Sequence, residues 1–300
     1  MSTPLRVRHL LSSKTLLLSE FIISQTESSA DIFFTWLDLG AIYLNQKRCV
    51  ADLVIDPGDY VRVHIQPKRF PLLNQSAENY VVAWEKDFVI FNKPQGFPCH
   101  PTVDNRKENL ITYFSDYFQK QFYLTHRLDT GTGGLWLLAL NQEFQKTFNV
   151  ILQNQMSQKI YVARTEKKWT QGLGRFTHYM KPSLRAPREV FENDFEKSLK
   201  CQLQVENIND SEKSTSDLEI RLLTGRTHQI RSQLSFLGSP ILGDTMYGSK
   251  YNFKEGLRER WALWAKELIF EADQKYHFKL PDETLHQVLA EFDFHPEKPS

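Results

Sequence analysis

One stretch constrains the fold of this chain more than any other: a charged, glycine-rich segment at 126–134 that runs directly into an apolar strand. The segment reads His-Arg-Leu-Asp-Thr-Gly-Thr-Gly-Gly, and residues 135–140 after it are all apolar. Such a run is typical of a strand buried on both faces, so the turn before it is held on a rigid element. The turn places Arg127 and Asp129 two residues apart. Charged side chains held in this way indicate a site for chemistry, although a turn-capping Asp129 paired with Arg127 would leave the same pattern.

Composition limits the class of protein but identifies no partner. The chain has 300 residues, 41% of them hydrophobic, which is enough for one large domain or two of ordinary size. Its formal net charge is only +1, so a nucleic-acid partner requires basic side chains clustered on one surface. No apolar run is long enough to cross a bilayer, and we expect a soluble cytoplasmic protein.

The cysteines and histidines do not suggest a metal or disulfide framework. Cys49, Cys99 and Cys201 lie far apart, form no C-x-x-C pair and are odd in number, which is typical of a reducing compartment. Neither His126 nor His228 has a second ligand at metal-binding spacing. We therefore expect no metal site.

Residues 1–72 are expected to form a small N-terminal α+β domain. Apolar residues at helical spacing predict a helix at 32–39, which Gly40 ends. It is followed by a strand at 41–44, a polar turn at 45–48, a return strand at 49–50 and an alternating strand at 60–65.

The order of these elements, with GAIYLN at 40–45 and PGDYVRVH at 57–64, resembles the small RNA-binding domain that many ribosomal and RNA-modifying proteins carry at their N-terminus. The chain departs from that domain at 27–31, where Glu-Ser-Ser-Ala-Asp replaces the usual basic, serine-containing start of the recognition helix. The resemblance implies RNA binding. The alternative is a module that only packs or recruits a partner.

Residues 73–300 are expected to form a mixed α+β domain with a mostly antiparallel sheet. Amphipathic periodicity predicts helices at 142–155 and 230–237. A polar, serine-rich stretch at 206–217 is typical of a surface loop. Strands are predicted at 80–84, 88–92, 135–140, 159–164 and 218–222.

Four motifs in this second domain place charged, aromatic or turn-forming residues where a site can form. The first, 92–101, ends a strand with prolines and a glycine, and the second is the segment at 126–134. The third, 159–161, puts a tyrosine hydroxyl on a strand, and the fourth, 223–231, is a glycine turn that opens a helix with two arginines. Each motif alone is a weak signal, so the interpretation depends on the order of all four along the chain.

In that order, the four motifs resemble the successive motifs of the RluA-type pseudouridine synthases. They read NKPQGFPCHP, HRLDTGTGGLWLLA, KIYVA and LLTGRTHQIRSQLSFLGSPILGDTMYG. The resemblance covers about residues 85–270. It implies the pseudouridine-synthase fold and an enzyme that isomerises uridine in RNA. The chain departs from the family's pattern at Gly133, where serine is usual, and at Leu140, where lysine is common.

The resemblance also implies roles for single residues. Asp129 matches the catalytic aspartate, Tyr161 the aromatic residue that stacks on the target base, and Arg231 the basic partner of the aspartate. Arg127 matches the side chain that enters the RNA stack when the base leaves it. We further assign RNA contacts to three residues, His126, Arg226 and His228.

The chemistry of the reaction is consistent with these roles. Uridine becomes pseudouridine when the glycosidic bond breaks, the ring turns and carbon 5 is joined to the ribose, with no redox change, so no cofactor is required. A carboxylate serves as nucleophile or electrostatic stabiliser if it stays ionised; burial raises its pKa and a nearby arginine lowers it. Tyr161 can stack and exchange a proton. Extruding the base costs roughly a few kcal/mol, which an inserted Arg127 helps to offset.

We therefore predict a monomeric RNA pseudouridine synthase that acts on structured RNA, either rRNA or tRNA, without a small-molecule cofactor. One alternative is a non-catalytic RNA-binding protein with the same fold. Another is a hydrolase that uses Asp129 and His228, for which the sequence shows no convincing paired general base.

Overall fold

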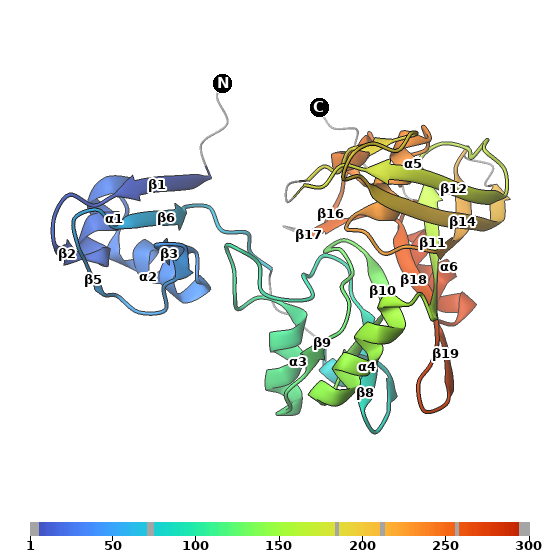
Figure 1. The fold of residues 1–300 in the computed structure, drawn as a ribbon, viewed down its shortest axis with the longest axis horizontal. Helices are drawn as coiled ribbons and strands as arrows, with labels where there is room; N and C mark the ends of the chain where they lie inside the picture. Colours follow the sequence, from blue (N-terminus) through green and yellow to red (C-terminus); the bar gives the residue numbers. More distant parts are fainter. Residues whose placement is uncertain (1–5, 71–74, 184–185, 211–213, 256–257, 294–300) are drawn as a thin grey trace. The chain divides into compact units, whose positions relative to one another are not determined.

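The structure is a computed structural model that describes residues 6–70, 75–183, 186–210, 214–255 and 258–293. The chain divides into two compact units, and most of their helices and strands are labelled in Figure 1. Unit 1 is Met1–Leu73 with Pro98–Asp116, and unit 2 is Asn74–Phe97 with Tyr117–Ser300. The predicted division at residue 72 lies outside the described residues. Residues 98–116, which the sequence placed in the second domain, group with unit 1.

Unit 1 is a small α+β body in which two helices cover one face of a sheet. The sheet has the strand order β1-β6-β3-β4, and β2 pairs separately with β5. Its core contains apolar side chains from helices and strands, including Leu18, Ile22, Phe33, Val61 and Val63. The bounds are β1 Val7–Leu11, β2 Leu16–Leu17, α1 Leu18–Thr26, α2 Ala30–Leu39, β3 Ile42–Leu44, β4 Lys47–Arg48, β5 Val54–Ile55 and β6 Tyr60–His64.

The helix predicted at 32–39 is confirmed as α2, which ends at Gly40 with a φ of 71°. The hairpin after it is tighter than predicted. The chain turns over Asn45 and Gln46 alone, with φ values of 47° and 70°, so the return strand is β4 and the prediction of 49–50 is wrong. Two-residue turns with positive φ at both positions match the twist of the paired strands, which favours this tight connection.

Residues 98–116 join unit 1 through hydrogen bonds that no local pattern predicts. The amide of Arg106 donates to the carbonyl oxygen of Leu39 over 2.7 Å. The guanidinium of Arg69 donates to the carboxylate of Glu108, with Nη2 and Oε1 2.6 Å apart. These bonds link stretches about 40 to 70 residues apart, which explains why the sequence alone assigned the segment to the other domain.

Unit 2 is built on one long sheet. In the part of the chain that the structure describes, this sheet has 11 strands in the order β13-β12-β14-β15-β11-β18-β10-β8-β7, with β19 on β18 and β9 on β10. The predicted α+β class with a mostly antiparallel sheet is confirmed. The bounds are β7 Val81–Trp84, β8 Phe88–Lys93, β9 Tyr123–Leu124, β10 Gly133–Ala139, β11 Ser157–Thr165, β12 Gly174–Met180, β13 Val190–Phe191, β14 Leu199–Asp210, β15 Ser216–Leu222, β18 Leu263–Glu271 and β19 Lys275–Lys279.

Short elements complete the described chain. A two-stranded pair is formed by β16 Phe253–Glu255 and β17 Arg258–Arg260. The remaining helices are η1 Ala77–Tyr80, α3 Leu110–Phe118, α4 Gln142–Gln153, α5 Gln229–Phe236, η2 Thr245–Tyr247 and α6 Asp282–Ala290. Among the described residues, none of the helices combines the length and the apolar character needed to span a membrane.

The apolar strand predicted after the charged segment is β10, and all of its residues are buried. It lies between β8, to which it is antiparallel, and β18, to which it is parallel. Because β10 begins at Gly133, Asp129 lies in the turn just before a strand fixed on both sides. The position of this turn is therefore fixed by the strands that flank β10; β8, β10 and β18 are labelled in Figure 1.

The prediction of a surface loop at 206–217 is largely wrong. Strand β14 continues to Asp210 and β15 already begins at Ser216; residues 211–213 lie outside the described part of the chain. Burial alternates along β14, so its polar side chains face solvent while its backbone pairs with β15. A polar strand with one solvated face has a composition that resembles a loop.

Candidate active site

The side chain of Asp129 is carried by a turn whose carbonyl groups are all engaged nearby. The amide of Thr132 donates to the carbonyl oxygen of Asp129 over 3.0 Å, which closes the turn. The buried amine of Lys93 donates to the carbonyl oxygens of Thr130 (3.1 Å) and Thr132 (2.8 Å). The amide of Gly96 also donates to Thr130, over 2.8 Å. These bonds satisfy buried polar groups and hold the turn against the end of β8.

Gly131 in the turn and Gly133 at the start of β10 lie against bulky indole rings. A Cβ atom at Gly131 would be 2.6 Å from the ring of Trp261, and one at Gly133 would be 2.5 Å from Nε1 of Trp264. Real Cβ atoms do not approach other atoms so closely. The indole of Trp264 thus gives a steric reason for glycine at position 133. The family whose motifs this chain resembles usually has serine there.

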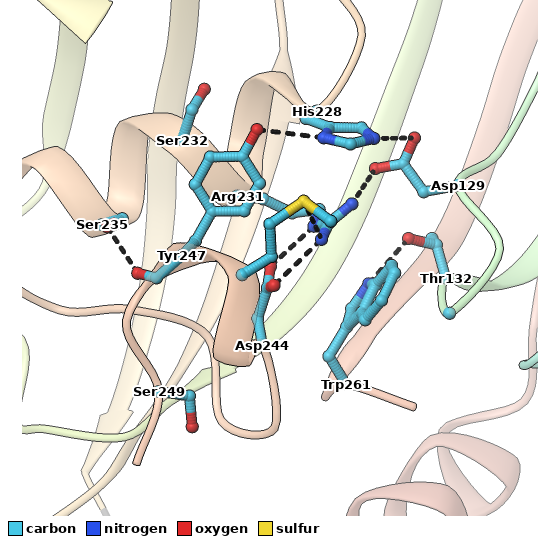
Figure 2. Close-up of polar contacts among 12 residues, drawn as sticks. Asp129, Thr132, His228, Arg231, Ser232, Ser235, Asp244, Tyr247, Ser249 and Trp261 are labelled. Carbon is cyan, nitrogen blue, oxygen red and sulfur yellow. Dashed lines mark hydrogen bonds and ion pairs between the residues drawn. The ribbon is translucent and has the colours of Figure 1, made fainter. Parts of the chain in front are cut away.

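The carboxylate of Asp129 bonds to the guanidinium of Arg231, which is carried by α5. Nη1 of Arg231 lies 3.1 Å from Oδ2 of Asp129, as Figure 2 shows. The Arg231 side chain is only 2% exposed, whereas the Asp129 side chain is 23% exposed. Asp129 is therefore the end of this pair that a substrate can reach.

Arg231 is held in place by a second carboxylate and two aromatic rings. Its Nε and Nη2 atoms donate to the two oxygens of Asp244 over 2.6 and 2.9 Å. Its Cζ atom lies 3.8 Å from the ring centroid of Trp261 and 4.9 Å from that of Tyr247. Burial opposes the charge of the guanidinium, but bonds to Asp244 and Asp129 outweigh it and raise the pKa of Arg231. The guanidinium is therefore a permanent cation in a fixed orientation.

His228 lies on the other side of the Asp129 carboxylate. Its Nε2 is 3.8 Å from Oδ1 of Asp129, and its Nδ1 is 2.9 Å from the hydroxyl of Tyr247. Burial lowers the pKa of His228, and the charge of Asp129 offsets this only in part. Burial also raises the pKa of Tyr247. At neutral pH both side chains are therefore uncharged, and Arg231 supplies the positive charge beside the carboxylate.

Tyr161 lies on β11, two strands away from the Asp129 turn. It pairs with Ala265 of β18, and Ala265 pairs with Gly134 of β10. Adjacent strands are about 4.8 Å apart, so the backbone of Tyr161 is roughly 10 Å from that of Gly134. The tyrosine is 6% exposed, and its predicted stacking role stays a prediction.

The other predicted contact residues occupy different surroundings. Arg127 and Arg226 are exposed, as an RNA contact requires. His126 is directed inward: its Nε2 accepts the amide of Leu137 over 3.2 Å, and its ring lies 6.2 Å from that of Phe148. Burial and the charge of Lys159 lower the pKa of His126 to about 3. A neutral ring that accepts a hydrogen bond from β10 favours a structural role for His126 over the predicted RNA contact.

Sequence reasoning missed the residues that hold the Asp129–Arg231 pair together. Asp244 is 1% exposed and Tyr247 is 6% exposed; both stand in the fourth resembling motif, but no local signal ties them to Arg231. Trp261 is buried as well, and its ring stacks on the guanidinium while its Nε1 donates to the hydroxyl of Thr132 over 3.1 Å.

The described residues gather no group of three or more His, Cys, Asp or Glu side chains that is arranged to hold a metal ion. The charged centre consists instead of two carboxylates and one guanidinium, drawn in Figure 2. Such a centre can present one accessible, oriented carboxylate to an electrophilic carbon.

Known proteins are similar to this chain in sequence and in fold. A family model described as RNA pseudouridylate synthase matches residues 87–236. The chain is 32% identical over 215 residues to RNA pseudouridine synthase 6, chloroplastic, of Arabidopsis thaliana; the match covers 64% of this chain and 45% of that protein. This chain thus spans about half the length of that relative. It is also 29% identical over 223 residues to the dual-specificity RNA pseudouridine synthase RluA of Vibrio parahaemolyticus, covering 72% of this chain and 84% of that one.

Among solved structures, the fold is similar to that of human RNA Pseudouridylate Synthase Domain Containing 4. The TM-score is 0.54 and the identity is 22%; the match covers 71% of this chain and 93% of the human one. At this identity the likeness concerns the fold alone.

Proposed function

Because this chain belongs to the RluA-type branch of the RNA pseudouridylate synthase family, we propose that it isomerises uridines in structured RNA to pseudouridine. The observation that supports this most directly is the accessible carboxylate of Asp129 bonded to the buried, doubly anchored guanidinium of Arg231. The test is a map of pseudouridine in cellular RNA with and without the gene. Loss of pseudouridine from rRNA or tRNA identifies the substrate, and an unchanged map in both contradicts the proposal.

In the proposed mechanism Asp129 acts on a uridine that has left the RNA stack. The bond between C1′ and N1 breaks, the uracil turns, and a bond between C1′ and C5 forms. The proton on C5 must then leave, and N1 ends protonated, so the atoms of uridine are conserved. Asp129 serves as nucleophile or as electrostatic stabiliser, and Arg231 keeps its carboxylate ionised and oriented.

We also assign the tautomer of His228. The hydroxyl oxygen of Tyr247 accepts the amide of Arg188 over 2.7 Å, so its own proton can be donated to Nδ1 of His228. This leaves the proton of the neutral imidazole on Nε2, which faces Asp129. The arrangement orients a polar N–H toward the carboxylate without adding a second cation.

Replacement of Arg127 by alanine should impair activity on structured RNA far more than on an unstructured oligonucleotide. This exposed arginine is proposed to fill the gap that the extruded base leaves, and only a stacked substrate needs that help. We expect kcat/KM to fall about 10-fold or more on a hairpin and about 2-fold on a loose strand. Parallel assays of both substrates measure the ratio, and equal losses would contradict the wedge role.

We further propose that unit 1 binds RNA through the sheet face opposite its helices. Register places His9 and Tyr43 directly opposite Arg62 on this face. The guanidinium of Arg62 lies 4.2 Å from the ring centroid of Tyr43, and its Nε is buried without a hydrogen-bond partner. The exposed His9 and the part-exposed Arg62 can meet RNA phosphates there. Tyr43, in contrast, is only 9% exposed, and its hydroxyl donates to the carbonyl oxygen of Val103 over 2.7 Å. The helix start instead carries an acid, Asp31.

The full-length variant Arg62→Gln should therefore weaken binding to structured RNA by about 3- to 10-fold. Turnover of a short unstructured oligonucleotide should stay the same. Asp31→Asn is the matched control for the opposite face. If Asp31→Asn strengthens binding while Arg62→Gln has no effect, the helices and not the sheet contact RNA. Equilibrium titration of labelled RNA gives both dissociation constants.

A further inference from the structure

Arg188 is tied to the catalytic centre through its backbone. It lies between β12 and β13, and its amide donates to the hydroxyl of Tyr247 over 2.7 Å. Tyr247 in turn contacts Nδ1 of His228, whose Nε2 faces Asp129. Figure 2 shows Tyr247, His228 and Asp129 in that order. The segment that carries Arg188 is thereby fixed beside the reacting carboxylate although it belongs to the far edge of the sheet.

The guanidinium of Arg188 has no anionic partner among the residues that the structure describes. The residue is half-buried, and its Nε is a buried donor without an acceptor. The charge of Arg188 is nevertheless close to the site. Burial is the main cause that lowers the pKa of His228, and the positive charges of Arg231 and Arg188 lower it further. A buried donor without an acceptor destabilises the folded protein, and in native proteins such donors are usually hydrogen-bonded to a protein group, a water or a ligand.

The charges around Asp129 indicate what kind of group would bind beside them. Asp129, Asp244 and Arg231 together carry a net charge of −1, and His228 is neutral. RNA brings a phosphate on each side of the extruded nucleotide, and this cluster repels both. A cation that lies beside the cluster, but forms no ion pair with its carboxylates, would bind such a phosphate.

Resting on the proposed function, we propose that the Arg188 guanidinium binds an RNA backbone phosphate next to the target uridine. Because Nε is itself buried, the phosphate binds the terminal Nη1 and Nη2 of the guanidinium, and the backbone contact to Tyr247 holds Arg188 near Asp129. Arg188 is thus assigned a binding subsite rather than a part in bond making.

The test is Arg188→Gln in the full chain, with a transcribed hairpin that carries uridines in its loop as the RNA. The variant keeps the amide that donates to Tyr247, so the contacts around Asp129 are retained. We expect Kd and KM to rise about 10-fold and kcat to change less than about 2-fold. The slope of log Kd against log salt concentration should become shallower by about one ion.

Two further variants make the result specific. Arg188→Lys should restore the salt slope but only part of the affinity, because lysine binds phosphate without the planar fork. Arg175→Gln removes an exposed arginine of β12 and should leave the slope unchanged. A fall in kcat with an unaltered slope would show that Arg188 positions Tyr247 and His228 instead. An equal slope change in Arg175→Gln would show unspecific attraction.

These outcomes are separable from the proposed activity. A wild-type protein that binds the hairpin with an Arg188-dependent slope but forms no pseudouridine contradicts the isomerase and not the subsite. If the wild type forms pseudouridine while Arg188→Gln has the same Kd, KM and salt slope, the result contradicts the phosphate subsite alone. Absence of hairpin binding by the wild type counts against both.

Discussion

Replacement of Asp129 by asparagine is expected to abolish pseudouridine formation while RNA binding stays almost unchanged. The amide oxygen of asparagine can still accept the hydrogen bond from Arg231, but the negative charge that nucleophilic or electrostatic catalysis needs is gone. We expect the single-turnover rate to fall by at least about 1,000-fold. The dissociation constant for RNA should change by no more than about 3-fold, because binding rests on other side chains. Nucleoside chromatography after complete digestion measures the product.

The control for this variant is Asp217→Asn. Asp217 also pairs with an arginine, Arg164, over 2.7 Å, but the pair joins β11 and β15 away from the Asp129 turn. This variant should keep a rate within about 3-fold of the wild type, because the buried Arg164 still has Asp293 and the carbonyl oxygen of Leu289 as partners. A comparable collapse of the rate in Asp217→Asn would point to damaged folding rather than lost chemistry. Turnover that survives in Asp129→Asn would remove the basis of the proposed mechanism.

Replacement of Arg231 by methionine should produce the largest loss of stability. It removes the partner of Asp244, whose side chain is 1% exposed, and leaves an uncompensated carboxylate in the interior. Breaking a buried ion pair in this way costs about 3 to 5 kcal/mol. The same change removes the cation beside Asp129 and should lower the rate by at least about 100-fold. Urea denaturation followed by tryptophan fluorescence, together with the turnover assay, measures both effects.

Arg231→Lys and the double variant Arg231→Met with Asp244→Leu are the controls. Lysine keeps the charge but cannot bond both oxygens of Asp244 and Asp129 together, so we expect an intermediate loss of stability. Removing both charges should recover much of the stability that Arg231→Met alone loses, because no buried charge is then left unpaired. Neither control should recover activity. A loss below about 1 kcal/mol in Arg231→Met would mean that the pair is not buried in solution.

Local patterns predicted most elements correctly where one periodicity dominates. The amphipathic stripe at 142–155 became α4, and the apolar run after the charged turn became the buried strand β10. The pattern failed at 206–217, because a strand with one solvated face and a loop share a polar composition. It also failed at 98–116, where hydrogen bonds to distant residues decide which unit the segment joins.

The candidate site divides in the same way. The sequence, through its order of motifs, singled out Asp129 and Arg231, which stand 102 positions apart and meet in the structure. It did not single out Asp244, Trp261 or the backbone of Arg188. A motif marks a residue by its neighbours along the chain, whereas these three act through contacts across the fold.

By itself the sequence determined the family, the buried strand that follows the Asp129 turn and the chemical types of the candidate site residues. Only the tertiary structure decided that Arg231 bridges two carboxylates, that an indole ring covers its guanidinium, and that His126 turns inward while His228 faces the acid. The physical reason is that burial and pairing depend on how distant strands pack. The periodicity of one strand does not specify which strands lie beside it.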